Sequence, residues 1–413
     1  MIQPICQLFL ALISKSLQAK PLVNRKRSSG RSKRKGEHML YYARRVRSGA
    51  VVAFLLAFAS FLLMPGAWTA QAQKAPTMAN LVEGAKKETT FRAMWGSDTL
   101  DGAAGLQKIV SAMNKKYGLK IKPAFTPGPN MQGMMTKIAR EKAAGQPASS
   151  DVYFGNPQSM LQASKVDVLE PMNWRSFLER PLKSDDPSFD PIVPGNIGIA
   201  MASTLVGVIY NSDRVKGNDI PKKLADILQP KWKGKIASTP YAAGLREFAM
   251  PELLGREFVM DYAKKLSKHI GGLMRCGEMD KITSGEFLML VLACGDQEVN
   301  IAQRSGIPLG YAIMDDATIS HTRYSAIPKN SRAPNTAALF ISYLHTAEGQ
   351  KLMWDIDGLD FHLYPESNQK KRLDAAKARG AKFVVSSPQW LGKNKDYAKT
   401  QNELEKILRG EAS

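Results

Sequence analysis

The chain alternates between two hydrophobic periods over residues 90–155. Apolar and polar residues alternate at 90–94 and 119–122, which predicts half-buried strands, and an apolar run at 151–154 predicts a third. Between the strands, apolar residues recur three and four positions apart, which predicts two helices. The first helix is marked by Leu106, Ile109, Val110 and Met113, and the second by Met131, Met134, Met135 and Ile138. Because β-α-β crossovers are right-handed, this order predicts a parallel sheet.

Turn residues follow each of the three predicted strands. The carboxyl ends of parallel strands meet at one edge of the sheet, where open α/β folds bind their ligands. We therefore expect the turns to line a ligand site, although each is alternatively an ordinary helix cap. They contribute Trp95, Gly96, Ser97 and Asp98 after the first strand, Asn130 after the second, and Gly155 and Asn156 after the third.

A second α/β unit follows a long surface connection that is predicted at 164–196, where Pro, Asp and Ser are frequent and periodic apolar positions are few. Strands are predicted in this unit at 205–210, 287–293 and 310–314. Helices are predicted at 224–228, 248–267, 333–354, 368–377 and 397–408. Two such units agree with the length of the chain, which exceeds one average domain.

The N-terminal region predicts an export signal. A basic flank at 41–47 precedes an apolar run at 50–64, and Ala70 and Ala72 supply small residues at the two positions that a signal peptidase reads. Cleavage is expected after Ala72, which predicts a periplasmic protein. Residues 1–38 lie upstream of this signal, which is complete if translation starts at Met39. An uncleaved membrane anchor at 49–70 is the alternative.

Charge is unevenly distributed along the chain. Residues 1–72 hold twelve Lys and Arg residues and one acidic residue, Glu37, whereas residues 73–413 hold 46 basic and 36 acidic residues. About half of the formal net charge of +21 therefore belongs to the segment that export is expected to remove. The remaining net charge of +10 is moderate for a globular body, which argues against nucleic acid as a partner.

Two cysteines, Cys276 and Cys294, remain downstream of the predicted signal. An even number of cysteines in an oxidising compartment is compatible with a disulfide, and two buried free thiols are the alternative. The chain carries no motif of serine hydrolases, zinc peptidases, P-loop enzymes or dinucleotide-binding enzymes. We therefore expect a binding protein without a cofactor, and no enzymatic activity.

Two blocks of the second unit resemble the type 2 periplasmic solute-binding proteins, in the branch that contains the ferric-ion-binding proteins. The first block joins a strand that ends in Tyr210 and Asn211 to the sequence Pro-Lys-Trp-Lys-Gly at 230–234. The second block runs from Ala-Ile-Pro-Lys at 326–329 into a helix that begins Ala-Pro-Asn-Thr-Ala-Ala at 333–338. Together with the early β-α-β-α-β order, the resemblance covers residues 80–360.

The resemblance implies an α/β receptor with two lobes, each a central sheet flanked by helices, and a ligand cleft between them. Closure on a small ligand is expected to produce the form that docks on the membrane permease of an ATP-driven ABC importer. We expect a monomer, and a membrane-tethered ligand-binding sensor is the alternative. The expected parts are 1–38 upstream, 39–72 signal peptide, 73–198 first part of lobe 1, 199–308 lobe 2, and 309–413 the return to lobe 1 with the C-terminal helices. Crossings between the lobes are expected near 195–201 and 309–314.

The resemblance also indicates where a ferric ion would bind. Ferric members carry adjacent tyrosines past a Gly-Glu pair, whereas here Gly285 and Glu286 lead to Ala-Cys-Gly-Asp-Gln at 293–297, without a tyrosine pair. The four histidines downstream of the signal are not paired at ligand spacing. Ferric iron is therefore the second hypothesis, and no metal ligand is assigned. A small organic anion or zwitterion, held at helix N-termini, is the first.

The second lobe contributes further candidate ligand contacts. Tyr241, Ala242 and Gly244 lie in a turn that is predicted to open a helix. Asp296 and Gln297 occupy the place where the family's ligand residues lie, as the resemblance implies. Asp315 follows the returning strand and is alternatively a helix cap.

N-terminal sequencing of the native protein tests the export signal. Because the signal layout is complete within 39–72, we expect Gln73 as the first residue of the mature chain. Peptides from residues 1–38 would contradict the start at Met39. Retention of residues 49–70 would contradict cleavage and favour the anchored form.

Overall fold

A computed structural model describes residues 77–97 and 99–411 of the chain. The predicted upstream segment and export signal at 1–72, and also Asp98, lie outside the described residues. Among the residues that are described, no helix combines the length and the apolar character needed to cross a bilayer.

The first sheet has the parallel order that the sequence predicts. β1 (Thr90–Trp95) and β2 (Lys122–Pro127) pair in parallel, and Ala93 of β1 forms a parallel bridge to Val152, just before β3 (Tyr153–Gly155). The helices of this region are α3 (Met78–Ala85), α4 (Gly102–Tyr117), α5 (Met131–Ala143) and α6 (Pro157–Ala163). The predicted β-α-β-α-β order is therefore confirmed.

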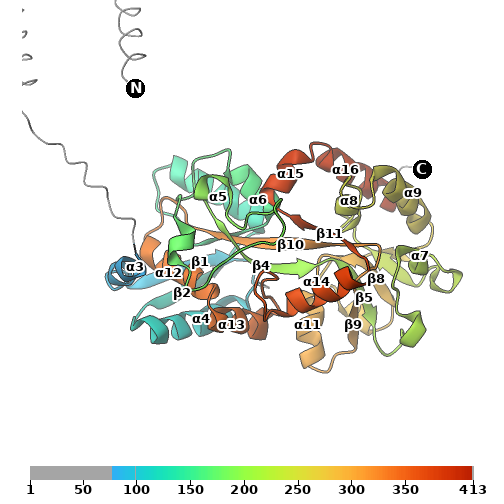
Figure 1. The fold of residues 1–413 in the computed structure, drawn as a ribbon, viewed down its shortest axis with the longest axis horizontal. Helices are drawn as coiled ribbons and strands as arrows, with labels where there is room; N and C mark the ends of the chain where they lie inside the picture. Colours follow the sequence, from blue (N-terminus) through green and yellow to red (C-terminus); the bar gives the residue numbers. More distant parts are fainter. Residues whose placement is uncertain (1–76, 98, 412–413) are drawn as a thin grey trace, which may run out of the picture. The chain divides into compact units, whose positions relative to one another are not determined.

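Two strands connect this region with the rest of the fold. β4 (Ile199–Leu205) and β10 (Ala317–Ala326) pair antiparallel. β10 pairs with β3 at its C-terminal end and with β11 (Lys382–Ser386) at its N-terminal end, so one strand runs between the two halves (Figure 1). The second crossing thus lies further along the chain than expected. Residues 309–314 instead contain β9 (Leu309–Ala312), which stays within the second sheet.

The second half contains a five-stranded sheet in the order β7-β6-β8-β5-β9. Its other strands are β5 (Gly207–Asn211), β6 (Ile236–Ser238), β7 (Gly272–Leu273) and β8 (Met289–Ala293). Its helices are α7 (Leu224–Ile227), α8 (Leu245–Phe248), α9 (Arg256–Ser267), α10 (Asp280–Thr283) and α11 (Gln297–Arg304), with 3₁₀ turns η3 (Gly217–Asp219) and η4 (Pro230–Trp232). The helix predicted at 248–267 is divided, because Pro251 and Gly255 separate α8 from α9.

The chain after β10 contacts both halves. The helix predicted at 333–354 forms two helices, α12 (Pro334–Leu344) and α13 (Ala347–Asp357), because Thr346 caps the second by accepting a hydrogen bond from Gly349 N at 2.9 Å. The following elements are α14 (Asn368–Ala378), β11, α15 (Pro388–Lys393) and α16 (Tyr397–Leu408). Figure 1 shows α15 beside α6 and α16 beside α8 and α9, as their residue contacts also indicate.

Buried apolar side chains fall into separate clusters, which define two lobes. The cluster around β1, β3 and α12 includes Phe91 and Phe340, and we call its residues lobe 1. Two further clusters, one around Phe248 and one around Leu290, form lobe 2. The connection at 164–196 is less exposed than predicted. It contains η1 (Trp174–Phe177), whose Trp174 is 2% exposed, and η2 (Pro194–Asn196), and it packs on lobe 1.

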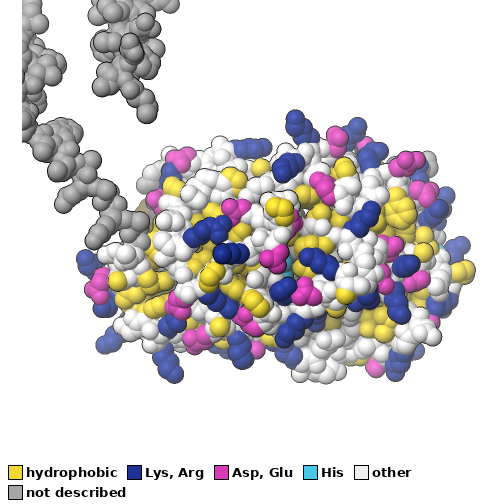
Figure 2. All heavy atoms as spheres, in the orientation of Figure 1, with side chains coloured by type: hydrophobic (Ala, Val, Ile, Leu, Met, Phe, Trp, Pro, Cys, Tyr) yellow, Lys and Arg dark blue, Asp and Glu magenta, His cyan; other side chains and the backbone are white. Residues whose placement is uncertain are grey.

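The distribution of charged side chains over the surface is as expected for a moderate net charge. Figure 2 shows basic and acidic side chains interspersed over the face in view, with no continuous basic surface there. A single basic face of the kind that binds nucleic acid is therefore not seen on that side of the molecule.

His362 is buried beside the crossing strand β4. Its Nδ1 lies 2.8 Å from Ser203 Oγ, and the side chain is 5% exposed. Burial is the largest cause that lowers the pKa of His362 to about 3, and Lys377 and Lys370 lower it further while Asp186 opposes them. An unfolded histidine binds its proton near pH 6.5. The contribution of His362 to stability is therefore present above pH 6.5 and is lost as the pH falls toward 3.

Denaturant unfolding at several pH values tests this assignment. Between pH 6.5 and 5 the protonation of unfolded His362 should remove about 2 kcal/mol from the free energy of unfolding. His362→Asn keeps a polar partner for the Ser203 hydroxyl but does not titrate, so its stability should fall less over the same range. Equal pH slopes for the two proteins would contradict the assignment.

Candidate functional site

A pocket of about 200 Å³ lies at the carboxyl edge of the lobe 1 sheet. Its lining comes from the ends of β1 and β3, the start of α5 and the crossing strand β10. The lining residues are Trp95, Gly96, Thr99, Pro129, Asn130, Met131, Met134, Phe154 and Arg323. Three of the residues predicted from the sequence, Trp95, Gly96 and Asn130, are thus brought together here.

Aromatic side chains form one wall of this pocket. The rings of Trp95 and Phe154 stack with centroids 4.7 Å apart, and Phe125 lies tilted against Trp95 at 5.4 Å. Trp95 and Phe154 are 3% and 4% exposed, so packing holds both rings in place. A Cβ at Gly128 would lie 2.7 Å from Met94 Cγ and 3.2 Å from Trp95 N. Glycine at position 128 therefore allows the turn before α5 to approach the end of β1.

Asn130 begins α5 at the pocket. Its side-chain oxygen accepts a hydrogen bond from Gly133 N at 2.9 Å, which leaves its NH₂ group outside the cap. The start of a 13-residue helix therefore faces the pocket lining, and its backbone dipole favours a negative charge there.

Arg323 is the charged side chain among the described residues that line the pocket. It comes from β10, at the point where the register with β4 shifts between Arg323 and Tyr324. Its Nη1 lies 3.8 Å from Met131 Sδ. Sequence reasoning missed Arg323 because β10 was not recognised as a strand. The β-branched and aromatic residues of this segment, Thr318, Ile319, Thr322 and Tyr324, were the available signal.

Asp357 connects the turn after β1 with lobe 2. Its Oδ2 accepts from Leu100 N at 2.8 Å, and its Oδ1 accepts from Gln297 Nε2 at 2.7 Å. Burial is the largest cause that raises the pKa of Asp357 to about 6, although both hydrogen bonds and Arg323 oppose the rise. Leu100 and Asp101 have left-handed φ angles of 48° and 54°, which cost on the order of 1 kcal/mol each. The bond to Asp357 helps to hold this strained turn beside the pocket.

α11 of lobe 2 contacts the end of α13 of lobe 1. Asn300 Nδ2 donates to Gly358 O at 3.0 Å, and Arg304 donates to the carbonyls of Trp354 and Asp355 at 2.6 and 2.8 Å. A cationic side chain at the last carbonyls of a helix also favours the helix dipole. Gly358 has a φ of 65°, and a Cβ there would lie 2.8 Å from Asn300 Cβ. The two lobes therefore meet closely at this point.

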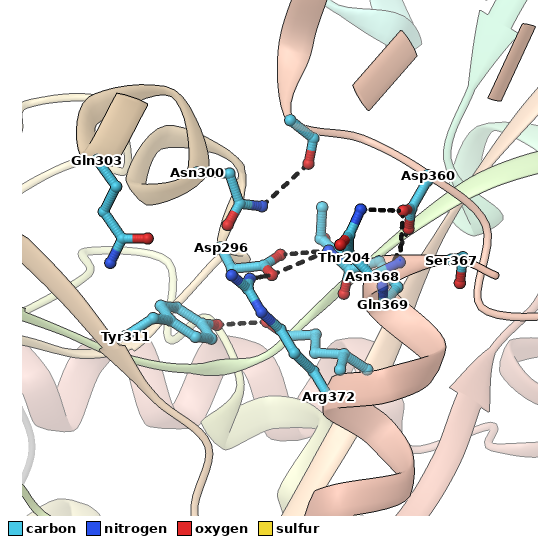
Figure 3. A network of polar contacts seen from close by, with 12 residues as sticks. Thr204, Asp296, Asn300, Gln303, Tyr311, Asp360, Ser367, Asn368, Gln369 and Arg372 are labelled. Carbon is cyan, nitrogen blue, oxygen red and sulfur yellow. Dashed lines mark hydrogen bonds and ion pairs between the residues drawn. The ribbon is translucent and has the colours of Figure 1, made fainter. Parts of the chain in front are cut away.

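Asp296 lies in a buried polar network and not at the pocket. Its carboxylate accepts two hydrogen bonds of 2.9 Å from Gln369 Nε2 and pairs with Arg372 (Figure 3). Asn368 and Gln369 also donate to Asp360, which fixes the start of α14. Since α14 supplies charged and polar partners to Asp296, the structure accounts for its burial without a ligand.

Tyr241 lies beside the disulfide between Cys276 and Cys294. The two cysteine Cα atoms are 6.1 Å apart, within the range that a disulfide requires. Tyr241 Oη accepts from Cys276 N at 2.9 Å, and burial raises the pKa of this phenol. Ala242 and Gly244 have φ angles of 51° and 72° and belong to a turn before α8. None of these residues lines the 200 Å³ pocket.

The remaining predicted site residues have structural partners elsewhere. Asn156 caps α6 by accepting from Ser159 N at 2.9 Å, directly after the buried Gly155. Asp315 pairs with Arg379 at 2.6 Å. Gln297 contacts Asp357, and Ser97 is exposed. Of the site residues predicted from the sequence, the pocket therefore contains only Trp95, Gly96 and Asn130 among those that the structure describes.

A second pocket, of about 300 Å³, lies between α13 and the start of α14. Its polar side chains already have protein partners. Gln350 bonds to the backbone of Met201, Leu344 and Phe361, and Asp360 bonds to α14. The 200 Å³ pocket is the better candidate site, because it lies at the carboxyl edge of the sheet, where open α/β folds bind their ligands.

The described residues do not bring a set of metal-ligating side chains together. Within residues 77–97 and 99–411, no group of three or more His, Cys, Asp or Glu side chains could hold a metal ion. The described lining of the pocket offers mainly thioethers and aromatic rings, which are poor ligands for ferric iron, and it includes no carboxylate, imidazole or phenol.

Comparisons with known proteins agree on one family and one fold. Residues 108–379 match the family model of the bacterial extracellular solute-binding proteins. The major ferric iron-binding protein of Neisseria gonorrhoeae is 21% identical over 259 residues, which cover 60% of this chain and 74% of that protein. Two solved structures share the fold at a TM-score of 0.58. One is AfuA of Actinobacillus pleuropneumoniae with fructose-6-phosphate bound, which is 19% identical and aligns over 78% of this chain and 99% of its own. The other is PotD of Streptococcus pneumoniae, a spermidine/putrescine substrate-binding protein, which is 16% identical and aligns over 77% of this chain and 100% of its own. The predicted α/β fold with two lobes is confirmed.

The contact between the lobes is tested by Gln297→Glu. A carboxylate at position 297 would face the Asp357 carboxylate in place of an amide donor, so the hydrogen bond should be lost. We expect the free energy of unfolding to fall by about 1–3 kcal/mol and the Leu100 amide to exchange faster in hydrogen-exchange mass spectrometry.

Gln303→Glu is the matched control on the same helix. Gln303 Nε2 donates to Leu309 O within lobe 2, so the same added charge does not meet lobe 1 there. Faster exchange of the Leu100 peptide in the control, or unchanged exchange in Gln297→Glu, would show that the Asp357 contact does not hold this turn.

Proposed function

The chain belongs to the family of bacterial extracellular solute-binding proteins, and on that basis we propose that it is the receptor of an ATP-driven importer for a small organic anion or zwitterion. The observation that carries the ligand class is the 200 Å³ pocket, which joins an aromatic wall, a helix start and Arg323. The helix start and Arg323 favour a negative charge on the ligand, and the aromatic wall favours an apolar surface.

Binding is proposed to couple to closure of the lobes. The pocket lies in lobe 1, while Arg323 belongs to the strand that crosses to lobe 2. Asp357 contacts both the turn beside the pocket and Gln297 of lobe 2. A ligand that orders this turn therefore favours the form in which Asp357 and Gln297 meet. Only a difference in ligand affinity between the two forms shifts their populations.

The proposed place of action is the periplasm, after cleavage of the predicted export signal. In this location the closed receptor would dock on the membrane permease and release its ligand. The receptor is proposed to act as a monomer. The tethered-sensor alternative requires that residues 49–70 remain attached and that the protein acts through a membrane partner that is not an importer.

Ferric iron is the second candidate, and the similarity to ferric iron-binding proteins is the observation that favours it. Two features of the chain oppose it. Residues 293–297 lack the tyrosine pair of the ferric members, and the described part of the chain holds no cluster of metal-ligating side chains. An organic anion is therefore proposed first.

A thermal-shift screen of mature protein, unfolded and refolded to remove carried ligand, separates the two candidates. A carboxylate or amino acid that binds only the folded form stabilises it by mass action and so raises its melting temperature. At a ligand concentration one hundred times Kd, the free energy of unfolding rises by about 3 kcal/mol. We expect at least one organic anion to do so, and ferric citrate to give no visible phenolate-to-iron absorption band.

Arg323→Met supplies the control for the position of binding. It should abolish the ligand-induced shift, whereas Arg379→Met, which removes a surface ion pair with Asp315, should keep it. A stoichiometric iron band without a response to any organic anion would overturn the proposal in favour of iron.

A further inference from the structure

We infer that the ligand is a compact organic anion with a flat apolar body, of the class of aromatic and arylalkyl carboxylates. This inference rests on the proposed function and narrows it. It follows from the volume of the pocket, the chemistry of its wall and the hydrogen-bond donors among its described lining residues, each considered in turn.

The volume of the pocket fits one ring and one acidic group. A cavity of about 150 Å³ lined by apolar side chains accommodates benzene. The pocket here is about 200 Å³. The additional volume corresponds roughly to one or two water molecules, at about 30 Å³ each, and is enough for a carboxylate or a short acidic arm.

The wall of the pocket favours a ligand with an apolar surface. Trp95, Phe154, Pro129, Met131 and Met134 contribute rings and thioethers, which offer few hydrogen bonds. Aromatic and thioether groups pack well against a flat ring. A sugar or a polyhydroxy acid would instead lose the hydration of several hydroxyl groups without gaining partners, and each unpaired group is costly.

The described polar groups that line the pocket favour an acidic group on the ligand. A guanidinium has five N–H donors, so Arg323 can hold a carboxylate through two of them in addition to its protein contacts. The Asn130 NH₂ group is not used by its helix cap. Trp95 Nε1 is buried and has no hydrogen-bond partner within the described residues, so an anionic acceptor at the ring edge would supply one. These three donors belong to described residues that line the pocket, and they favour a ligand with an acidic end.

The acidic end and the apolar body are therefore recognised by different groups of the pocket. The carboxylate lies between Arg323, on the crossing strand, and the start of α5. The ring lies against Trp95 and Phe154, which come from β1 and β3. In this arrangement the charge of the ligand meets the strand that joins the lobes, and its apolar body is recognised by lobe 1.

The first test measures binding of four probes to the ligand-free mature protein by isothermal titration calorimetry. Benzoate and phenylacetate should bind, benzamide should bind roughly tenfold to a hundredfold more weakly than benzoate, and citrate should not bind detectably. Benzamide has nearly the same shape as benzoate without its charge, so this pair isolates the acidic end. Citrate has charge without an apolar body.

The second test places a negative charge in the pocket without removing a structural contact. Asn130→Asp keeps an equally good cap for α5 and adds a charge beside the proposed carboxylate. Benzoate affinity should fall roughly tenfold to a hundredfold, with little change in the melting temperature of the free protein. Thr77→Asp is the matched control, because Thr77 is the exposed cap of α3 and lies outside the pocket. It should leave benzoate affinity unchanged.

The outcomes separate this inference from the proposed function. Tight binding of citrate or a phosphorylated sugar, with no response to benzoate or phenylacetate, would overturn the ligand class and leave the receptor function intact. Equal affinities for benzoate and benzamide would overturn the role of the acidic end. Absence of binding by any organic probe, together with a ferric band, would overturn both.

Discussion

The antiparallel pairing of β4 with β10 is the constraint on which the site depends. β10 pairs with β3 of lobe 1 at its C-terminal end and with β11 at its N-terminal end, so the strand passes from one lobe to the other. The register with β4 shifts beside Arg323, and such irregularities redirect a side chain. A charged residue on the crossing strand thereby reaches a pocket whose other described walls belong to lobe 1.

The contacts at α11 and α13 give this pairing a functional consequence. Asp357 receives one hydrogen bond from the turn beside the pocket and another from lobe 2, so the position of the turn and the position of the lobes are linked. Arg304 and Asn300 add bonds to the same helix end. Asp296 and its partners on α14 form a second, separate set of contacts. In the proposed receptor, closure and ligand binding favour each other through these contacts.

The order of elements in lobe 1 could be predicted from the sequence more fully than the residues of the candidate site. The β-α-β-α-β order followed from clear periodicity, and it correctly placed Trp95, Gly96 and Asn130 at one edge. β10 was missed because Thr318, Ser320, Thr322 and Ser325 are buried polar residues, which hide the apolar pattern of a central strand. Arg323 was missed with it. Asp296 resembled a ligand residue by position along the chain, whereas Gln369 and Arg372, more than seventy residues later, are its partners. Such long-range pairing has no local signal.

Native mass spectrometry of the protein isolated from the periplasm tests the central claim most directly. The claim is that a two-lobed receptor holds one small organic anion in the pocket formed by Trp95, Phe154 and Arg323. The account predicts a one-to-one complex, and release of a single low-mass organic acid when the protein is denatured. A complex whose added mass is that of iron alone, or of a polyamine, would contradict it.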